Sequence, residues 1–312
     1  MTVRLLALIT ATAYGSAAFA DATYIDRSQG RVRVDVLETG LTIHTYLSKG
    51  LPGGLGSVNS HIFETDDAVM IVDTQFYRAA AEDVRAYVEG LGKPVERIII
   101  SHAHPDHGFG YSYMSDLAPA SGTAETIAEA AGAFPFFASA MVERMGQEAA
   151  AANFPLDDIP QITETLAEGS FTFGPTEIEV FVLPSHEAGT QTFIGLPKHG
   201  MLWVFDAIMP NAHQLVFGQP GAAFEDRLHT GKHLIDDLAG RETYDTLVFG
   251  HNSIEPLPKD EQLANAREGL RIYGELAKTA ESPEAFIAGA AEVKPDWGQF
   301  YVPMTTSAVF SE

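Results

Sequence analysis

The stretch Ser101-His102-Ala103-His104-Pro105-Asp106-His107-Gly108 places three imidazoles and one carboxylate within six residues. It follows the apolar run 95–100, which predicts a buried strand. Imidazole nitrogens and carboxylate oxygens are the usual ligands of zinc and other divalent transition metals. With 11 histidines in 312 residues, three within six positions are not expected by chance. The stretch therefore predicts a metal site at the end of a strand, and a solvated polar loop is the weaker alternative.

The composition indicates a globular protein and narrows the classes of partner and of ligand. The chain is 46% hydrophobic and 20% charged, and its formal net charge is −23. Such an acidic chain is not expected to have nucleic acid or an anionic membrane surface as its main partner, so we expect a small-molecule substrate. It has no cysteine, which excludes disulfides, a thiol nucleophile and thiolate metal sites. His, Asp and Glu are left as metal ligands.

The first twenty residues have the pattern of a secretory signal peptide. Arg4 gives a positive start, residues 5–13 an apolar middle, and Ala18-Phe19-Ala20 a small-x-small end. We expect cleavage after Ala20 and export to the periplasm or secretion. The apolar run is too short for a membrane anchor, and no later stretch approaches the length of a transmembrane helix, so we expect no membrane span in the mature chain.

The rest of the chain, residues 21–312, shows no linker or break in composition and is predicted to form one domain. Apolar runs predict strands at 58–64, 69–72, 171–173, 178–183, 191–196, 201–205 and 246–249. Helical spacing predicts helices at 78–91, 225–238, 259–279 and 282–291. Residues 123–160 have helical character, and 132–154 within them are rich in Phe, Met and Ala. This segment is interpreted as an insertion or lid, with the alternative that its aromatic residues are core.

Three further strands end in a potential metal ligand. The runs before His186, Asp206 and His251 are apolar, and each ligand follows at or near the end of its run. A single histidine at a strand end is more often structural, so each one alone is a weak signal. If these strands lie in packed sheets, the three residues meet at one edge with the cluster at 102–107. Together they form an ordered set of seven candidate ligands.

The order of these motifs resembles that of the metallo-β-lactamase superfamily. H-x-H-x-D-H is followed by a single His, a single Asp and a final His, and Asp73 at the end of 69–72 resembles the first motif of that superfamily. The resemblance runs from about residue 58 to 252. It implies an α/β (α+β) fold, the αββα four-layer sandwich, with the site at one edge of two packed sheets.

The resemblance also implies two zinc ions per chain and a role for each ligand. It assigns His102, His104 and His186 to the first metal, Asp106, His107 and His251 to the second, and Asp206 to a position between them. Asp73 would orient the cluster loop by hydrogen bonds. An Asp at position 206 resembles the hydroxyacylglutathione hydrolase, lactonase and phosphodiesterase branches, whereas zinc β-lactamases usually carry Cys or Ser there. Ser185-His186-Glu187-Ala188-Gly189 departs from the more usual Gly-His-Thr.

The expected function is an exported dinuclear zinc hydrolase of a small ester, lactone, thioester or amide. Two zinc ions would share a water and lower its pKa to about neutrality, so that the resulting hydroxide attacks the substrate. Asp106 would orient this nucleophile and pass its proton to the leaving group. Phosphodiester cleavage, β-lactamase-like activity, an iron-dependent oxidoreductase and a non-enzymatic binding protein remain alternatives. The candidates for the substrate pocket are Tyr111, His213, Phe217 and Asn252.

Overall fold

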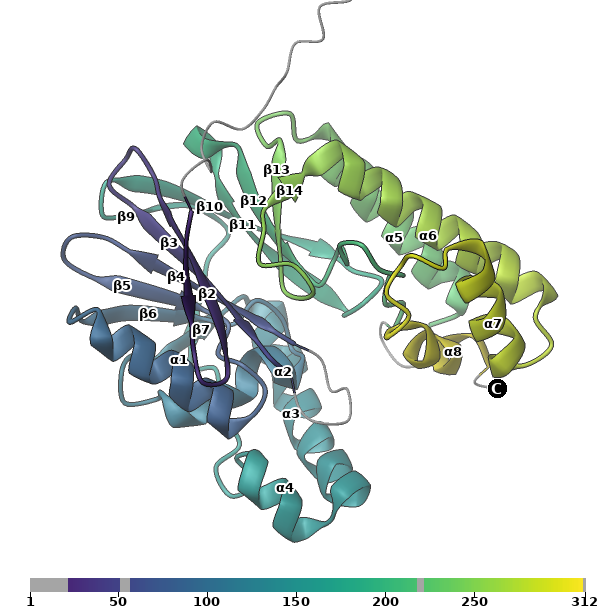
Figure 1. The fold of residues 1–312 in the computed structure, drawn as a ribbon, viewed down its shortest axis with the longest axis horizontal. Helices are drawn as coiled ribbons and strands as arrows, with labels where there is room; N and C mark the ends of the chain where they lie inside the picture. The colour runs from purple at the N-terminus through teal and green to yellow at the C-terminus, as the bar shows by residue number, and fades with distance from the viewer. Residues whose placement is uncertain (1–21, 51–56, 218–221, 311–312) are drawn as a thin grey trace, which may run out of the picture.

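The fold consists of two β-sheets packed face to face, with helices on both outer faces (Figure 1). The computed structural model describes residues 22–50, 57–217 and 222–310. The predicted signal peptide, residues 1–20, lies outside the described residues, so its cleavage and the export of the chain stay predictions.

The first sheet has eight strands in sequential order, β1 to β8. Strands β1 to β5 pair antiparallel, and β5 to β8 pair parallel. The four-residue strand β5 is completely buried, because it lies in the middle of the sheet with helices on one face and the second sheet on the other. The bounds of the strands are β1 Thr23–Asp26, β2 Gly30–Val36, β3 Thr42–Ser48, β4 Asn59–Glu64, β5 Val69–Val72, β6 Val95–Ile99, β7 Ala120–Gly122 and β8 Glu164–Thr165.

The second sheet has six strands in the order β14-β13-β12-β11-β10-β9. Its pairs are antiparallel except for β12 with β13, which run parallel. Both sheets therefore contain neighbouring parallel strands whose carboxyl ends lie at one edge. The bounds are β9 Gly169–Phe173, β10 Thr176–Pro184, β11 Thr190–Leu196, β12 Met201–Phe205, β13 Thr246–Phe249 and β14 Leu257–Pro258.

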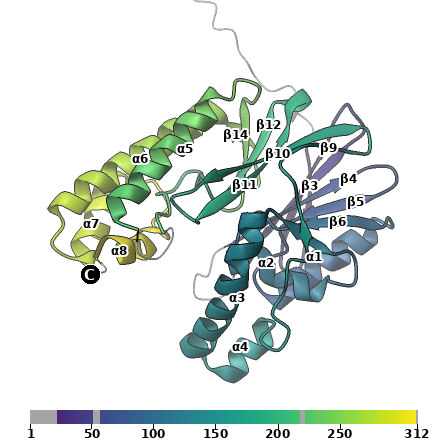
Figure 2. The same cartoon turned by 180° about the vertical axis from the view of Figure 1, so that it is seen from behind.

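The helices form the two outer layers, which Figures 1 and 2 show from opposite sides. Helices α1, α3 and α4 lie on the side of the first sheet, and α5 to α8 on the side of the second. The long helices agree with the predicted ones, whereas α8 was not predicted. The bounds are α1 Arg78–Gly90, α2 Pro105–Gly108, α3 Ala124–Met145, α4 Gln147–Asn153, α5 Phe224–Gly240, α6 Lys259–Thr279, α7 Pro283–Val293 and α8 Val302–Phe310.

Three groups of buried side chains hold these four layers together. The central one lies between the sheets, where Phe63 of β4 packs against Trp203 of β12 with ring centroids 5.0 Å apart. A second joins the first sheet to α1 and α3, and a third joins the second sheet to α5, α6, α7 and α8. Burial of apolar surface on both faces of each sheet is the main stabilising contribution. The predicted αββα four-layer sandwich is confirmed.

The segment 123–160, interpreted from the sequence as a lid or as core, contributes both to the hydrophobic core and to the wall of a cavity. Thr123 caps α3, and the helix continues through Pro135. Phe134 is buried against Phe109, with ring centroids 5.6 Å apart, whereas Phe136 is 66% exposed. Phe137, one residue further, lines a cavity described below. Helix α3 is therefore part of the core on one face and a cavity wall on another.

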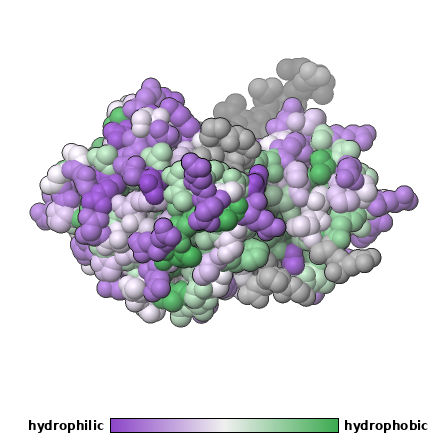
Figure 3. All heavy atoms as spheres, turned by 90° about the horizontal axis from the view of Figure 1, so that it is seen from below, coloured by the Kyte–Doolittle hydropathy of each residue, from purple (hydrophilic) through white to green (hydrophobic). Residues whose placement is uncertain are grey.

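The outer surface is mixed in character. From below the view of Figure 1, hydrophobic side chains gather near the middle of a face that is otherwise largely hydrophilic (Figure 3). Among the described residues, no helix combines the length and the apolar character needed to cross a membrane.

Candidate metal centre

The predicted ligands come together where strands of both sheets end. His102 follows β6, Asp206 follows β12 directly, and His251 comes two residues after β13. The backbone is strained here: Asp73, Phe205 and Asn252 have φ values of 63°, 46° and 62°. Left-handed conformations cost free energy for residues other than glycine and often cluster at functional sites. The strained turns aim successive side chains from different strands at one point.

Two groups of potential metal ligands share Asp206. The first contains His102, His104, Glu187 and Asp206, and the second contains Asp106, His107, Asp206 and His251. Within each group, one ligand atom from every residue lies within 4.8 Å of the others. The structure therefore brings together six of the seven predicted ligands and adds one that was not predicted.

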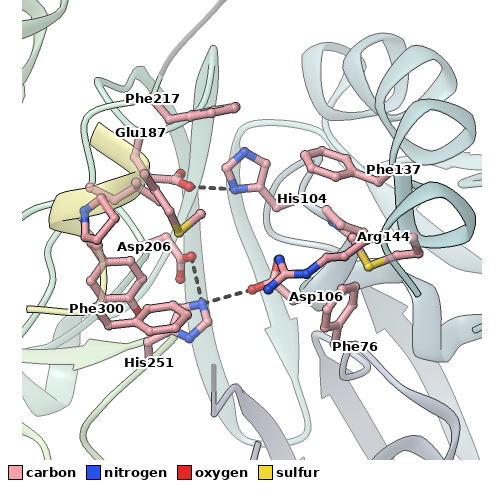
Figure 4. Close-up of a pocket in the computed structure, with 16 residues that line it drawn as sticks. Phe76, His104, Asp106, Phe137, Arg144, Glu187, Asp206, Phe217, His251 and Phe300 are labelled. Carbon is pink, nitrogen blue, oxygen red and sulfur yellow. Dashed lines mark ion pairs between the residues drawn. The ribbon is translucent and has the colours of Figure 1, made fainter. Parts of the chain in front are cut away.

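The Asp206 carboxylate lies at the centre of this arrangement. Its Oδ2 atom is 2.9 Å from His251 Nε2, 3.2 Å from His107 Nε2 and 3.8 Å from His102 Nε2. The Asp106 Oδ2 atom lies 3.2 Å from the same His251 nitrogen. In the first group, His104 Nδ1 and Glu187 Oε1 are 2.5 Å apart. Figure 4 shows the Glu187 carboxylate paired with His104, and Asp206, Asp106 and His251 grouped near them.

Asp73 fixes the cluster loop by three hydrogen bonds. Its Oδ1 accepts from the Ser101 backbone N–H at 2.8 Å, and its Oδ2 accepts from the Ser101 hydroxyl and from His107 Nδ1, both at 2.8 Å. The single proton of the Ser101 hydroxyl is directed at the Asp73 carboxylate. The Ser101 hydroxyl oxygen therefore accepts a hydrogen bond from His102 Nδ1 at 2.9 Å. Both rings thus turn their Nε2 atoms toward the metal-binding groups, which is the orienting role expected for Asp73.

His251 is oriented in the same manner by backbone. Its Nδ1 donates to the Ser57 carbonyl oxygen at 2.5 Å, which leaves Nε2 free to face Asp106 and Asp206. Gly250, which precedes it, leaves room for the Asp206 carboxylate, because a Cβ atom at this position would overlap Asp206 Oδ1. The Phe249-Gly250-His251 sequence therefore supplies a ligand and the space for its neighbour.

The charges at the site are strongly coupled. Burial alone would lower the pKa of His107 and of His251, but Asp206 and the neighbouring acids raise the pKa of both well above the ordinary value. Burial likewise opposes protonation of His104, yet the Glu187 carboxylate raises its pKa to about 9. The pKa of Asp206 is well below its usual range: burial raises it, and His107 and His251 lower it more. A metal ion binding here must displace protons from the imidazoles.

The donor set and its unpartnered atoms fit divalent metal ions. His102 Nε2, Glu187 Oε2 and Asp206 Oδ1 are buried without a hydrogen-bond partner. Leaving such atoms unpaired costs free energy, and a bound cation removes that cost. Imidazole with carboxylate is a donor set for zinc, manganese or iron.

The structure places one of the predicted ligands, His186, outside both ligand groups. Its neighbour Glu187 occupies the position in the first group. The His186 ring lies instead against Gly231 of α5, where an added Cβ would come within 2.9 Å of the ring. The signal that could have found Glu187 is the departure from Gly-His-Thr, because it places a second potential ligand directly after the histidine.

The metal-binding groups lie at the floor of a cavity of about 520 Å³ with largely apolar walls (Figure 4). Helix α3 contributes Phe137, Met141 and Arg144, and the loop that leads into α8 contributes Phe300 and Tyr301. Arg144 is the only Arg or Lys among the described residues lining this cavity. The remaining lining residues are Phe76, His104, Pro105, Asp106, Glu187, Asp206, Leu215, Phe217, His251, Pro303 and Met304.

Of the four residues predicted to line a substrate pocket, only Phe217 does so. Tyr111 is buried, and its hydroxyl donates to the Ala118 carbonyl oxygen. His213 is stacked on Tyr273 in the core, with ring centroids 5.8 Å apart, and Asn252 is exposed outside the cavity lining. These three residues follow ligands in the sequence, but the structure places them outside the cavity lining. The walls come from α3 and the C-terminal region instead.

Comparisons with known proteins agree with this fold. Residues 53–194 match the family model described as the metallo-beta-lactamase superfamily, and no curated protein sequence matches the chain. A metallo-beta-lactamase family protein from Thermus thermophilus is 18% identical, with a TM-score of 0.61, over 86% of this chain and 91% of that one. A metallo-beta-lactamase from Pontibacter korlensis is 14% identical, with a TM-score of 0.54, over 77% of this chain and 99% of that one. The resemblance predicted from the motifs is confirmed.

Proposed function

We propose that this chain, which has the metallo-β-lactamase fold, is an exported dinuclear metal-dependent hydrolase of small molecules. The observation that carries the proposal is that two ligand groups share Asp206 at the floor of an apolar cavity. Members of the superfamily are mostly metal-dependent hydrolases, which supports this class of reaction. Zinc is the first candidate metal, held by His102, His104, Glu187 and Asp206 and by Asp106, His107, Asp206 and His251.

The protein's own groups have defined tasks in such a reaction. Bound metal ions supply Lewis acidity and a water that is deprotonated near neutral pH. Asp106 faces the cavity, with its Oδ2 atom 3.2 Å from His251 Nε2. This carboxylate can accept a proton from the attacking water and deliver it to the leaving group. The apolar walls exclude bulk water, which strengthens these interactions.

The walls of the cavity favour a substrate with an apolar body and one hydrogen-bond acceptor or anionic group. Phe137, Phe217 and Phe300 supply aromatic surface, and Arg144 extends from α3 as a cation. Arg144 has neither an ion pair nor a hydrogen bond among the described residues, so its guanidinium is available to a ligand. We expect a small ester, lactone, thioester or amide of this kind.

Metal removal tests the proposed function. The purified mature chain is expected to contain two metal ions by mass spectrometry and to hydrolyse at least one class among esters, lactones, thioesters, amides, β-lactams and phosphodiesters. Treatment with a chelator should abolish turnover, and added zinc should restore it, because the metals activate the water. Fewer than one metal ion per chain, or no hydrolysis across the panel with metals bound, contradicts the proposal. Oxygen uptake by an iron-loaded sample would indicate an oxidoreductase instead.

Arg144→Met tests the orientation of the substrate. For substrates that carry a carboxylate, KM should rise about tenfold, because a charge-assisted hydrogen bond contributes about 1.5–3 kcal/mol. A neutral analogue with the same apolar body should keep its KM. Lys232→Met, on the exposed surface of α5, removes a positive charge away from the cavity and should leave the KM of both substrates unchanged. An equal rise in KM for charged and neutral substrates in Arg144→Met would show that Arg144 does not contact the anionic group.

A further inference from the structure

The loop after β10 determines which of two adjacent side chains reaches the metal-binding groups. The Ser185 hydroxyl oxygen accepts from the backbone N–H groups of Glu187 at 3.2 Å and Ala188 at 3.5 Å, and the Ser185 N–H donates to the Gly189 carbonyl oxygen. These bonds close a tight turn, a common role of serine. The His186 carbonyl oxygen also accepts from Phe217 N–H at 3.0 Å. The backbone on both sides of the His186–Glu187 peptide is therefore fixed.

Within this turn, the Glu187 side chain points at the first ligand group. Its carboxylate is completely buried, and its oxygens lie 2.5 Å from His104 Nδ1 and 3.8 Å from His102 Nε2 (Figure 4). The Oε1 atom is ion-paired with the His104 imidazole, whereas the Oε2 atom is buried without a hydrogen-bond partner. Leaving a buried carboxylate oxygen unpaired costs free energy, which a further cation would remove. The position of this carboxylate and its unpartnered Oε2 atom are those of a ligand.

The His186 side chain points the other way, under α5. Both of its ring nitrogens are buried without a hydrogen-bond partner, and its ring fills the space above Gly231. A glycine inside a helix costs roughly 1 kcal/mol relative to alanine. At Gly231 this cost has a structural reason, because a side chain would collide with the His186 ring. The glycine on α5 thus accommodates the inward histidine, and the turn leaves Glu187 to face the metal.

We propose that Glu187, and not His186, is the protein ligand that this loop gives to the first metal ion. The inference rests on the metal binding in the proposed function, but not on the reaction. The first group then presents two imidazoles and two carboxylates instead of three imidazoles and one carboxylate. Carboxylate oxygens suit manganese better than imidazole nitrogens do. The first position is therefore more tolerant of manganese than a site with three histidines.

Metal binding to the full mature chain, stripped of metal and then supplied with zinc alone or manganese alone, tests this assignment. The variants are Glu187→Gln, Glu187→His and His186→Leu, with thermal unfolding as a check of folding. Wild type and His186→Leu should bind two zinc ions. Glu187→Gln should keep about one and bind the other at least about 100-fold more weakly. Glu187→His should regain the second zinc ion, and its preference for zinc over manganese should rise about tenfold or more over wild type.

The outcomes separate this inference from the proposed function. Loss of one metal ion in His186→Leu with two retained in Glu187→Gln would overturn the assignment of Glu187. Should His186→Leu fail to fold, Glu187→His decides, because a histidine at 187 restores zinc only if this side chain faces the site. Two metal ions in wild type without any hydrolysis would overturn the hydrolase but leave the assignment intact. Fewer than one metal ion in wild type would overturn both.

Discussion

Asp206→Asn is expected to reduce the metal content from two ions to one or none and to lower turnover at least about 10³-fold. Asp206 is the only residue found in both ligand groups, so its loss weakens both metals at once. Asparagine keeps the volume of this buried side chain but replaces one carboxylate oxygen with a donor. An amide cannot ligate two cations or balance the protonated His107 and His251 rings.

Metal analysis and steady-state kinetics on the same preparation measure this effect. Asp157→Asn is the matched control, because Asp157 is exposed and far along the chain from every ligand. The control should retain two metals and wild-type turnover. The Asp206 variant should also lower the pKa of His107 and His251 in the metal-free protein, since that carboxylate raises both. Full metal content in Asp206→Asn would show that the two groups do not depend on a shared ligand.

The sequence pattern was sufficient for most of the strands, the long helices and most of the candidate site, and the family resemblance supplied the four layers of the fold. The runs that end near Asp73, Asp206 and His251 are short and apolar because these strands are completely buried, and the run before His102 is buried at its end. Residues that follow such strands lie close together, because neighbouring parallel strands end at the same edge of the sheet. The cluster at 102–107 is equally local, because its short helix α2 begins at Pro105 and presents Asp106 and His107 together.

The structure places Glu187 and not His186 in the first ligand group because of contacts that are not visible in the sequence. His186 and Glu187 are adjacent, and either could ligate a metal, so the direction of each side chain decides between them. That direction is set by the Ser185 turn and by Gly231, which lies 45 residues later on α5. The sequence likewise does not show which residues line the cavity. Arg144, Phe137 and Tyr301 are distant from the ligands in sequence and meet them only when α3 and the C-terminal region pack around the cavity.

Asp73→Asn is expected to destabilise the metal-free protein by about 3 kcal/mol and to weaken metal binding about 10- to 100-fold. Asp73 is completely buried, and all the partners of its carboxylate are donors: Ser101 N–H, the Ser101 hydroxyl and His107 Nδ1. Whichever way the asparagine amide is turned, its NH₂ group faces a donor. Asparagine tolerates the φ of 63° as aspartate does, so the variant changes the hydrogen bonds without adding backbone strain.

Urea unfolding of the metal-free protein and zinc titration of the folded protein separate the two effects. Asp67→Asn, an exposed residue in the turn before β5, is the control and should match wild type in both measurements. Unchanged unfolding with weaker zinc binding would mean that Asp73 acts only by orienting the rings of His102 and His107. Unchanged values in both would contradict its role. The Asp73 carboxylate accepts hydrogen bonds from Ser101 and His107, which belong to the loop of metal ligands. We therefore expect the free energy of unfolding and the metal affinity of Asp73→Asn to fall together.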